Sequence, residues 1–277
     1  MTILQALVLG FVEGLTEFLP ISSTGHLTIL ESAMGFSVDD PDITAFTAII
    51  QVGAVFATLL YFREDLWRIA KAWVFGVLGR GPRDFDYLFG WSVIVGSIPI
   101  AIVGLAFKDQ IETTLRSLYV VGAALILWSG VMWFADRNGP QDRGERDVTW
   151  RDALVIGITQ CLALIPGVSR SGATMSAGLL RGFDRVTVTR LSFFLSIPAL
   201  TAAAILQTVT KYDEISTGVG WGPTITATVT SFVVAYVAVA WLLRYIAKHD
   251  YSIFIVYRVA LGSLILTLTT AGVLAAT

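Results

Sequence analysis

Residues 6–26 read ALVLGFVEGLTEFLPISSTGH, and residues 153–172, 147 positions further on, read ALVIGITQCLALIPGVSRSG. Aligned without a gap, the two stretches share Ala6, Leu7, Val8, Gly10, Leu15, Ser22 and Gly25. Glu13 of the first stretch meets Gln160 of the second. A duplicated segment of this kind indicates an internal repeat, and in membrane proteins the interface between repeats is where substrate sites lie.

The composition places the chain in a lipid bilayer. It is 55% hydrophobic and 14% charged, with a mean hydropathy of +0.72. These values are far more apolar than those of an ordinary soluble domain. The formal net charge of −2 lacks the basic excess that a nucleic-acid partner requires. We therefore expect membrane lipid around the chain and no nucleic acid bound to it.

The apolar runs predict an all-α integral membrane protein. Six runs of about 20 residues are long enough to span: 44–62, 87–106, 117–135, 187–208, 223–243 and 252–275. Segments 2–35 and 150–181 are interrupted in their middle, too long for one straight span and too short for two with a turn. Irregular backbone at membrane depth is tolerated only where it lines a cavity. Both segments are therefore predicted to be re-entrant helical hairpins with polar tips.

Charge asymmetry predicts the orientation of a single membrane domain, 1–277. With residue 1 outside and each hairpin returning to its side of entry, fourteen of the 19 Lys and Arg residues lie inside and three lie outside. The first repeat, 1–135, and the second, 150–277, each contain one hairpin and three spans. Because three crossings are an odd number, the second repeat is inverted, and the two hairpin tips can meet near the midplane.

Two carboxylates lie on the first hairpin. Glu13 and Glu17 are one helical turn apart and so share a face. Like charges at this spacing repel, and in a dry site they need a cation, a histidine or a proton beside them. The alternative is a helix face that contacts lipid headgroups. The apolar neighbours argue against it: Gly14, Leu15, Phe18 and Leu19.

Each tip is a loop that enters a helix, where free N–H groups and the helix dipole favour an anion. The first tip supplies Ser22, Ser23, Thr24, Gly25 and His26, and the second supplies Ser169, Arg170, Ser171 and Gly172. Simple N-capping needs one hydroxyl, and the first tip has three. Arginine suits bidentate phosphate binding, and at membrane depth it is a functional candidate. Histidine beside serine and glutamate is a candidate acid, base or orienting group.

Together the tips favour phosphoryl chemistry. The donors suit a phosphate or diphosphate, whereas Glu13 and Glu17 would repel it unless they hold a divalent metal or transfer protons. An inverted repeat is also a transporter architecture, so a carrier or flippase for an anionic lipid or solute remains the alternative. Phosphate release in detergent, where no second compartment exists, would separate the two.

Residues 13–26, EGLTEFLPISSTGH, resemble the first signature of the undecaprenyl-diphosphate phosphatases, the bacitracin-resistance membrane family, and residues 166–172, PGVSRSG, resemble the second. Further stretches sit in family-like order: 50–54, 96–99, 191–198 and Tyr257-Arg258. The resemblance implies an enzyme that hydrolyses undecaprenyl diphosphate, a polyprenyl diphosphate lipid, to the monophosphate and inorganic phosphate. It further implies interlocked re-entrant hairpins and a pocket that opens to the outer side of the plasma membrane.

Carried over by position, the resemblance assigns catalytic roles to Glu13, Glu17, Ser23, His26 and Arg170. Substrate contacts are expected from Ser22, Thr24, Gly25, Ser169, Ser171, Gly172 and Arg258; for Arg258 the alternative is a side chain that only snorkels to the membrane interface. The cofactor expected is Mg²⁺ or Ca²⁺, held by Glu13 and Glu17. Attack by Ser23 on phosphorus and attack by a water that Ser23 orients both remain open. The oligomeric state is not fixed, and a homodimer is one option.

Overall fold

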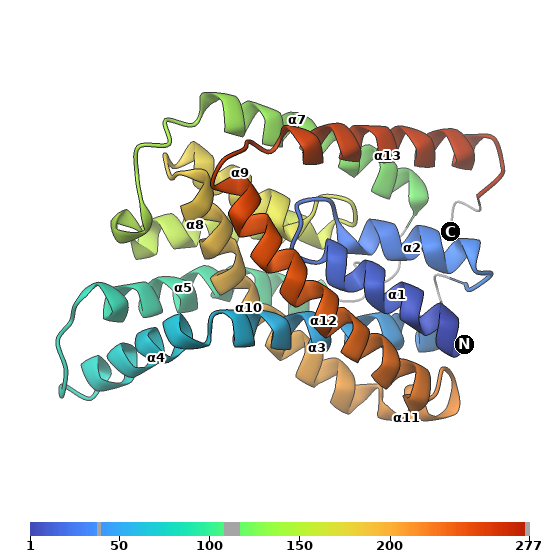
Figure 1. Cartoon of the computed structure of the whole chain (residues 1–277), viewed down its shortest axis with the longest axis horizontal. Helices are drawn as coiled ribbons and strands as arrows, with labels where there is room; N and C mark the ends of the chain where they lie inside the picture. Colours follow the sequence, from blue (N-terminus) through green and yellow to red (C-terminus); the bar gives the residue numbers. More distant parts are fainter. Residues whose placement is uncertain (38–39, 108–116, 275–277) are drawn as a thin grey trace.

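The computed structural model describes residues 1–37, 40–107 and 117–274. These residues are all-helical and form no strand. The helices, labelled in Figure 1, are α1 (Ile3–Thr16), α2 (Ser23–Ala33), α3 (Pro41–Tyr61), α4 (Arg63–Val77), α5 (Phe85–Ala106), α7 (Leu118–Asn138), α8 (Trp150–Gln160), α9 (Arg170–Leu180), α10 (Arg185–Thr210), α11 (Tyr212–Thr217), α12 (Trp221–Ile246) and α13 (Ser252–Thr270). Short 3₁₀ helices are η1 (Glu145–Asp147) and η2 (Cys161–Leu164).

Six of the described helices are long and apolar enough to cross a membrane, as the sequence predicts. They are α3, α5, α7, α10, α12 and α13. Each contains its predicted run or nearly so, and helices α10 and α12 reach two to three residues beyond the prediction at both ends. The last predicted run, 252–275, ends in the structure at Thr270, and its final residue lies outside the described part of the chain.

The two interrupted segments form two pairs of short helices. Helices α1 and α2 come from segment 2–35, and α8 and α9 come from segment 150–181. Helix α1 packs along α12, and α8 packs along α5. The close approach depends on glycine, since a Cβ at Gly10 would overlap the main chain of Ala227, and one at Gly157 would overlap that of Gly96. Identical positions of the duplicated stretch thus make equivalent contacts.

Contacts between the two halves of the sequence hold the bundle together. Helix α3 packs against α10 and α12, and α13 lies beside α7, as Figure 1 shows along one side of the molecule. The largest buried apolar cluster draws on both halves, with Phe18 edge-on to Phe193 at a centroid distance of 5.3 Å. The segments that carry the two tips are therefore fixed by helices of the opposite half.

An ionic cluster joins the loop before α8 to the end of α9. The buried carboxylate of Asp152 accepts from Arg143 Nη2 at 2.7 Å and from Arg181 Nη2 at 2.7 Å. Burial alone would raise the pKa of this carboxyl, but hydrogen bonds from Arg143, Thr149 and Arg181 outweigh it and hold the pKa well below its usual range. The cluster lies outside the six long helices and joins the first turn of α8 to the C-terminal end of α9.

Candidate active site

The two tips share an unusual local geometry. Ser22 and Ser169 both have φ of 74°, in the left-handed region that residues with a Cβ rarely adopt. Such a residue costs about 1–3 kcal/mol and persists only where its surroundings determine it. Each serine is an N-cap: Ser22 Oγ accepts from the N–H of Gly25 at 3.4 Å, and Ser169 Oγ accepts from the N–H of Gly172 at 3.2 Å. The duplicated sequence therefore gives a duplicated helix start.

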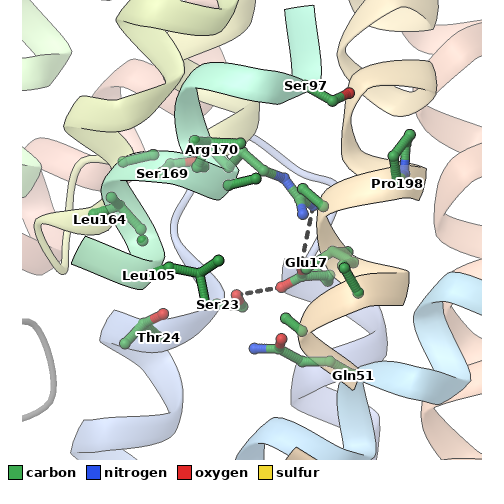
Figure 2. Close-up of a pocket in the computed structure, with 18 of the residues that line it drawn as sticks. Glu17, Ser23, Thr24, Gln51, Ser97, Leu105, Leu164, Ser169, Arg170 and Pro198 are labelled. Atoms are coloured by element: carbon green, nitrogen blue, oxygen red, sulfur yellow. Dashed lines mark hydrogen bonds and ion pairs between the residues drawn. The ribbon is translucent and has the colours of Figure 1, made fainter. Parts of the chain in front are cut away.

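Glu17 is the point where the tips meet. The Ser23 hydroxyl donates to Glu17 Oε2 at 2.5 Å, and Arg170 Nη2 donates to Glu17 Oε1 at 3.0 Å. Figure 2 shows Ser23 and Arg170 approaching this carboxylate from two directions. The side chains of Arg170 and Glu17 are only 12% and 6% exposed, so this ion pair is largely withdrawn from water. A second cross-tip bond runs from Ser171 Oγ to the carbonyl of Leu19 at 2.9 Å.

A cavity of about 860 Å³ opens beside this arrangement. Its polar end is formed by the two helix starts, so the positive dipole ends of α2 and α9 border the same space. Its remaining walls are mostly apolar and come from α5, η2 and α10, including Ile98, Leu105 and Leu164. The cavity therefore combines two helix starts, whose dipoles favour an anion, with a mostly apolar lining.

Two buried polar side chains of the predicted site have atoms that lack partners among the described residues. Arg170 Nε has no hydrogen-bond acceptor, and neither carboxylate oxygen of Glu13 has a donor. An unpaired buried donor or acceptor is costly, so each of these groups is suited to binding a ligand. For Arg170 the ligand would be an anion, and for Glu13 it would be a cation or a proton.

The structure brings part of the predicted set to the cavity wall. The residues that line it are Glu17, Ser22, Ser23, Thr24, Ser169 and Arg170. The predicted residues that do not line it are Glu13, Gly25, His26, Ser171, Gly172 and Arg258. Glu13 lies buried behind Glu17, and the N–H groups of Gly25 and Gly172 are already bound by the capping serines.

Arg258 has a position that the sequence did not predict. Its side chain is fully buried, and its guanidinium donates to the carbonyl of Pro20 in the first tip and to those of Gly167 and Val168 in the second. Nε donates to Ser129 Oγ. With these donors committed to protein acceptors and the side chain off the cavity wall, Arg258 ties the two tips together from behind. The expectation that it contacts substrate is not supported by this geometry.

Sequence reasoning missed several residues of the cavity. Gln51 of α3, Ser97 of α5 and Pro198 of α10 line it, and Figure 2 shows them around the same space as Glu17. They stand inside the stretches 50–54, 96–99 and 191–198 that resemble the family, but the resemblance alone gave them no role. A polar residue in the middle of an apolar span was the available signal for Gln51.

Glu13 and Glu17 are the acidic residues expected to hold a metal ion. Among residues 1–37, 40–107 and 117–274, no group of three or more His, Cys, Asp or Glu side chains is placed to hold a metal ion. Glu13 and Glu17 lie within electrostatic range of each other, and Glu13 has no partner for either oxygen. Mg²⁺ commonly binds one or two carboxylates together with substrate phosphates, and the pair fits that pattern.

Comparison with known proteins places the chain among its relatives. The sequence profile of the bacitracin resistance protein BacA matches residues 6–264. The chain is 70% identical to undecaprenyl-diphosphatase 3 of Frankia casuarinae, with 100% of both chains covered. It is 54% identical to the undecaprenyl-diphosphatase of Cutibacterium acnes, with 99% of each chain covered. It is 53% identical to undecaprenyl-diphosphatase 1 of Streptomyces avermitilis, covering 98% of this chain and 97% of that protein. The chain therefore belongs to the BacA family of bacitracin resistance proteins.

Proposed function

We propose that the protein is a membrane hydrolase that converts undecaprenyl diphosphate to undecaprenyl phosphate and inorganic phosphate. The reaction would recycle a lipid carrier for cell-envelope glycan synthesis and confer bacitracin resistance, in keeping with the names of its relatives. The observation that carries the proposal is the hydrogen-bonded set Ser23–Glu17–Arg170 beside a cavity whose lining is otherwise mostly apolar. A diphosphate group suits the Ser23–Glu17–Arg170 set, and a prenyl chain suits the apolar lining.

Arg170 and the helix starts bind the diphosphate in this mechanism. The unpaired Nε of Arg170 and its planar fork suit the non-bridging oxygens of the terminal phosphate. Positive charge and the dipoles of α2 and α9 then stabilise the negative charge that builds up on the transferred group. Binding has to compete with Glu17 for the guanidinium, so the Glu17–Arg170 pair is the resting state of the site.

Glu17 is the proposed general base because the Ser23 hydroxyl already donates to it. In one route Ser23 Oγ attacks the terminal phosphorus, its proton passes to Glu17, and the bond to the bridging oxygen breaks to release undecaprenyl phosphate. Water then cleaves the phosphoserine and frees inorganic phosphate. In the other route Ser23 orients a water that attacks directly, and Glu17 takes the proton of that water. Both routes use the same contacts.

A divalent cation, Mg²⁺ or Ca²⁺, is a further part of the proposal. Glu13 and Glu17 would hold it together with oxygens of the diphosphate. When bound, it would neutralise phosphate charge and separate the diphosphate from the two carboxylates. The unpartnered oxygens of Glu13 support this role, and they equally support a proton shared between the two glutamates.

The architecture that we propose is two inverted repeats with re-entrant hairpins. Helices of 11 to 14 residues extend about 16–21 Å, well short of the roughly 30 Å hydrocarbon core, so α1–α2 and α8–α9 would each enter and return. The equivalent packing of α1 on α12 and of α8 on α5 supports the repeat, as does the shared φ of Ser22 and Ser169. The excess of basic residues in the segments predicted to lie inside supports a plasma-membrane location with the cavity facing outward.

A phosphate-release assay in detergent tests the function. Purified protein should liberate inorganic phosphate from a prenyl diphosphate without a second compartment. A carrier or flippase, which the repeat architecture would also suit, would release none and would instead move the lipid between the leaflets of liposomes. Absence of phosphate release by folded protein, with and without added Mg²⁺ or Ca²⁺, would refute the hydrolase assignment.

A further inference from the structure

Tyr257 contacts the first tip through His26. Its hydroxyl lies 2.7 Å from His26 Nε2, and the two rings are nearly parallel, with 5.6 Å between centroids and 6° between planes. Tyr257 belongs to α13, 231 positions from His26 in the sequence. Neither the resemblance nor the proposed mechanism gives this tyrosine a role, and neither side chain lines the cavity.

Partner chemistry fixes the tautomer of the neutral His26 ring. Nδ1 lies 2.7 Å from the carbonyl oxygen of Ser22, which can only accept, so Nδ1 carries a proton. In the neutral imidazole Nε2 is then an acceptor, and the Tyr257 hydroxyl donates to it. Both ring nitrogens are therefore occupied, and His26 is not free to remove a proton from Ser23 or from a water in the cavity.

The carbonyl that His26 binds belongs to the strained residue of the tip. Ser22 has φ of 74°, and it immediately precedes Ser23, which donates to Glu17. Rotation of the Ser22 peptide would move the Ser23 hydroxyl relative to Glu17. A hydrogen bond on the Ser22 carbonyl opposes that rotation, because strained backbone persists only where surrounding contacts determine it.

The helix that carries Tyr257 is held in place by other contacts. Its neighbour in sequence, Arg258, donates to carbonyls of both tips and is fully buried. Helix α13 is therefore anchored to the tips at the position where Tyr257 projects, and α13 also packs along α7. The hydroxyl of Tyr257 thus holds the His26 ring from an element that is itself tied to the site.

We propose that Tyr257 is a positioning residue for the hydrolysis: its hydroxyl orients His26, and His26 holds the Ser22 carbonyl so that Ser23 faces Glu17. The proposal rests on the proposed function for its catalytic consequence. The contact itself, Tyr257 to His26 to Ser22, is independent of that function. His26 accordingly acts through backbone position and not as an acid or base.

The kinetic test compares Tyr257→Phe, His26→Ala and the double variant. Tyr257→Phe keeps the ring stack and loses the hydroxyl, so kcat for prenyl diphosphate should fall about tenfold, with KM within about twofold. Because the tyrosine acts through His26, the double variant should be no slower than His26→Ala alone. Unchanged kcat in Tyr257→Phe would overturn the proposal. Losses that multiply in the double variant would also overturn it.

The chain provides a matched control. Tyr245 and His249 form a second stacked pair, 4.4 Å between centroids and 8° between planes, in which His249 Nδ1 contacts the main-chain oxygen of Tyr245. That pair lies outside the cavity. Tyr245→Phe removes a hydroxyl from a similar pair and should leave kcat and KM at the wild-type values. A tenfold loss in Tyr245→Phe would mean that the Tyr257 result reports a general effect of removing a tyrosine hydroxyl.

A nitrogen NMR experiment tests the contact without turnover. The chain has two histidines, so ¹⁵N-histidine labelling gives two rings, and the His26→Ala sample identifies the His26 signals. In wild type, at a pH where the His26 ring is neutral, His26 should be protonated at Nδ1. Tyr257→Phe should shift the Nε2 resonance of His26 and leave His249 unchanged. Protonation at Nε2 in wild type, or an unshifted Nε2 in Tyr257→Phe, would overturn the proposal. If wild type released no phosphate, the hydrolase assignment would fail while this spectrum still tested the contact.

Discussion

At the residue scale, Glu17 connects the two halves of the site. It accepts from Ser23 of the first tip and from Arg170 of the second, so one carboxylate holds both the hydroxyl and the guanidinium to which the proposal gives catalytic roles. The Glu17–Arg170 pair is largely buried, so removal of either partner would leave a buried charge unpaired and would be costly. In the proposed mechanism, a phosphate that displaces Glu17 from Arg170 would free this carboxylate to act as the base.

Arg170→Lys should lower activity by an order of magnitude or more. Lysine keeps the positive charge but presents a single ammonium group, which cannot engage Glu17 and a phosphate through a planar fork. The measurement is phosphate release from a prenyl diphosphate, with kcat/KM converted to a loss of transition-state stabilisation. Turnover close to that of wild type would reject the bidentate role of the guanidinium.

Ser23→Ala and Ser22→Ala should have different effects. Ser23→Ala removes the hydroxyl that donates to Glu17, so nearly all turnover should disappear while the protein stays folded in detergent. Ser22→Ala removes an N-cap, which costs about 1 kcal/mol of stability, and should retain more activity. Turnover and thermal unfolding of both variants give the comparison. An inactive Ser22→Ala beside an active Ser23→Ala would move the catalytic assignment by one residue.

Chelation should show whether a divalent metal or a shared proton accompanies Glu13 and Glu17. If a divalent metal lies between Glu13 and Glu17, a chelator should abolish turnover, added Mg²⁺ or Ca²⁺ should restore it, and Glu13→Gln should weaken the metal dependence. If a shared proton is present instead, the chelator should have little effect, and the pH–rate profile should move in Glu13→Gln. Full activity of both Glu13→Gln and Glu17→Gln with chelator and across pH would remove the pair from the chemistry.

At the element scale, the tips depend on where their helices are anchored. Helices α8 and α9 are joined at their outer ends by Asp152, which accepts from Arg143 and Arg181. These contacts lie at the opposite end of the helices from Arg170, the first residue of α9. The ionic cluster thus fixes the spread of the two helices, while the tip between them carries the site.

Asp152 should make folding stability sensitive to acid. Because its pKa is lower in the folded protein than in the unfolded chain, its contribution is present above the unfolded pKa, about 4, and is lost as the pH falls below it. The unfolding temperature in detergent should therefore fall progressively from about pH 5 downward, with most of the loss below about pH 4. Asp152→Asn should lower stability by about 1–3 kcal/mol at neutral pH and flatten that acid limb. An unchanged acid limb in Asp152→Asn would assign it to other carboxyls.

Sequence patterns predicted the long elements well and the short ones less well. Six spans follow from hydropathy because lipid requires a long apolar run, whatever the packing. Helix α4 was not predicted, because the charged residues in Arg63–Val77 interrupt the apolar pattern. In the structure this helix packs against α5. The tip geometry of Ser22 and Ser169 could not be predicted, because a left-handed serine is determined by contacts and not by propensity.

The site itself divides in the same way. Glu17, Ser23 and Arg170 were predicted from residue type and resemblance, and the structure places them within bonding distance. The positions of His26 and Arg258 were not predictable. His26 contacts Tyr257, 231 positions away, and Arg258 binds the carbonyl of Pro20, 238 positions away. Residue type indicates which chemistry is available, whereas long-range packing decides which residues reach the cavity.

At the scale of the whole molecule, neither half of the sequence forms the site alone. Helix α1 of the first half lies on α12 of the second, and α8 of the second lies on α5 of the first. The cavity takes Ser23 from one half and Arg170 from the other, and its apolar walls from α5 and α10. This packing brings the two tips into contact. The orientation of the chain in the membrane then decides to which side of the membrane the cavity opens.

Cysteine labelling in intact cells should resolve that orientation. In a Cys161→Ser background, which removes the single native cysteine, Arg80→Cys lies in a segment predicted to be inside, and Ser37→Cys lies in one predicted to be outside. Both positions are exposed, so accessibility of the side chain does not favour either one. A membrane-impermeant thiol reagent should label position 37 in intact cells and should reach position 80 only after permeabilisation. The opposite pattern would invert the chain, and an outward-facing cavity would then become an inward-facing one.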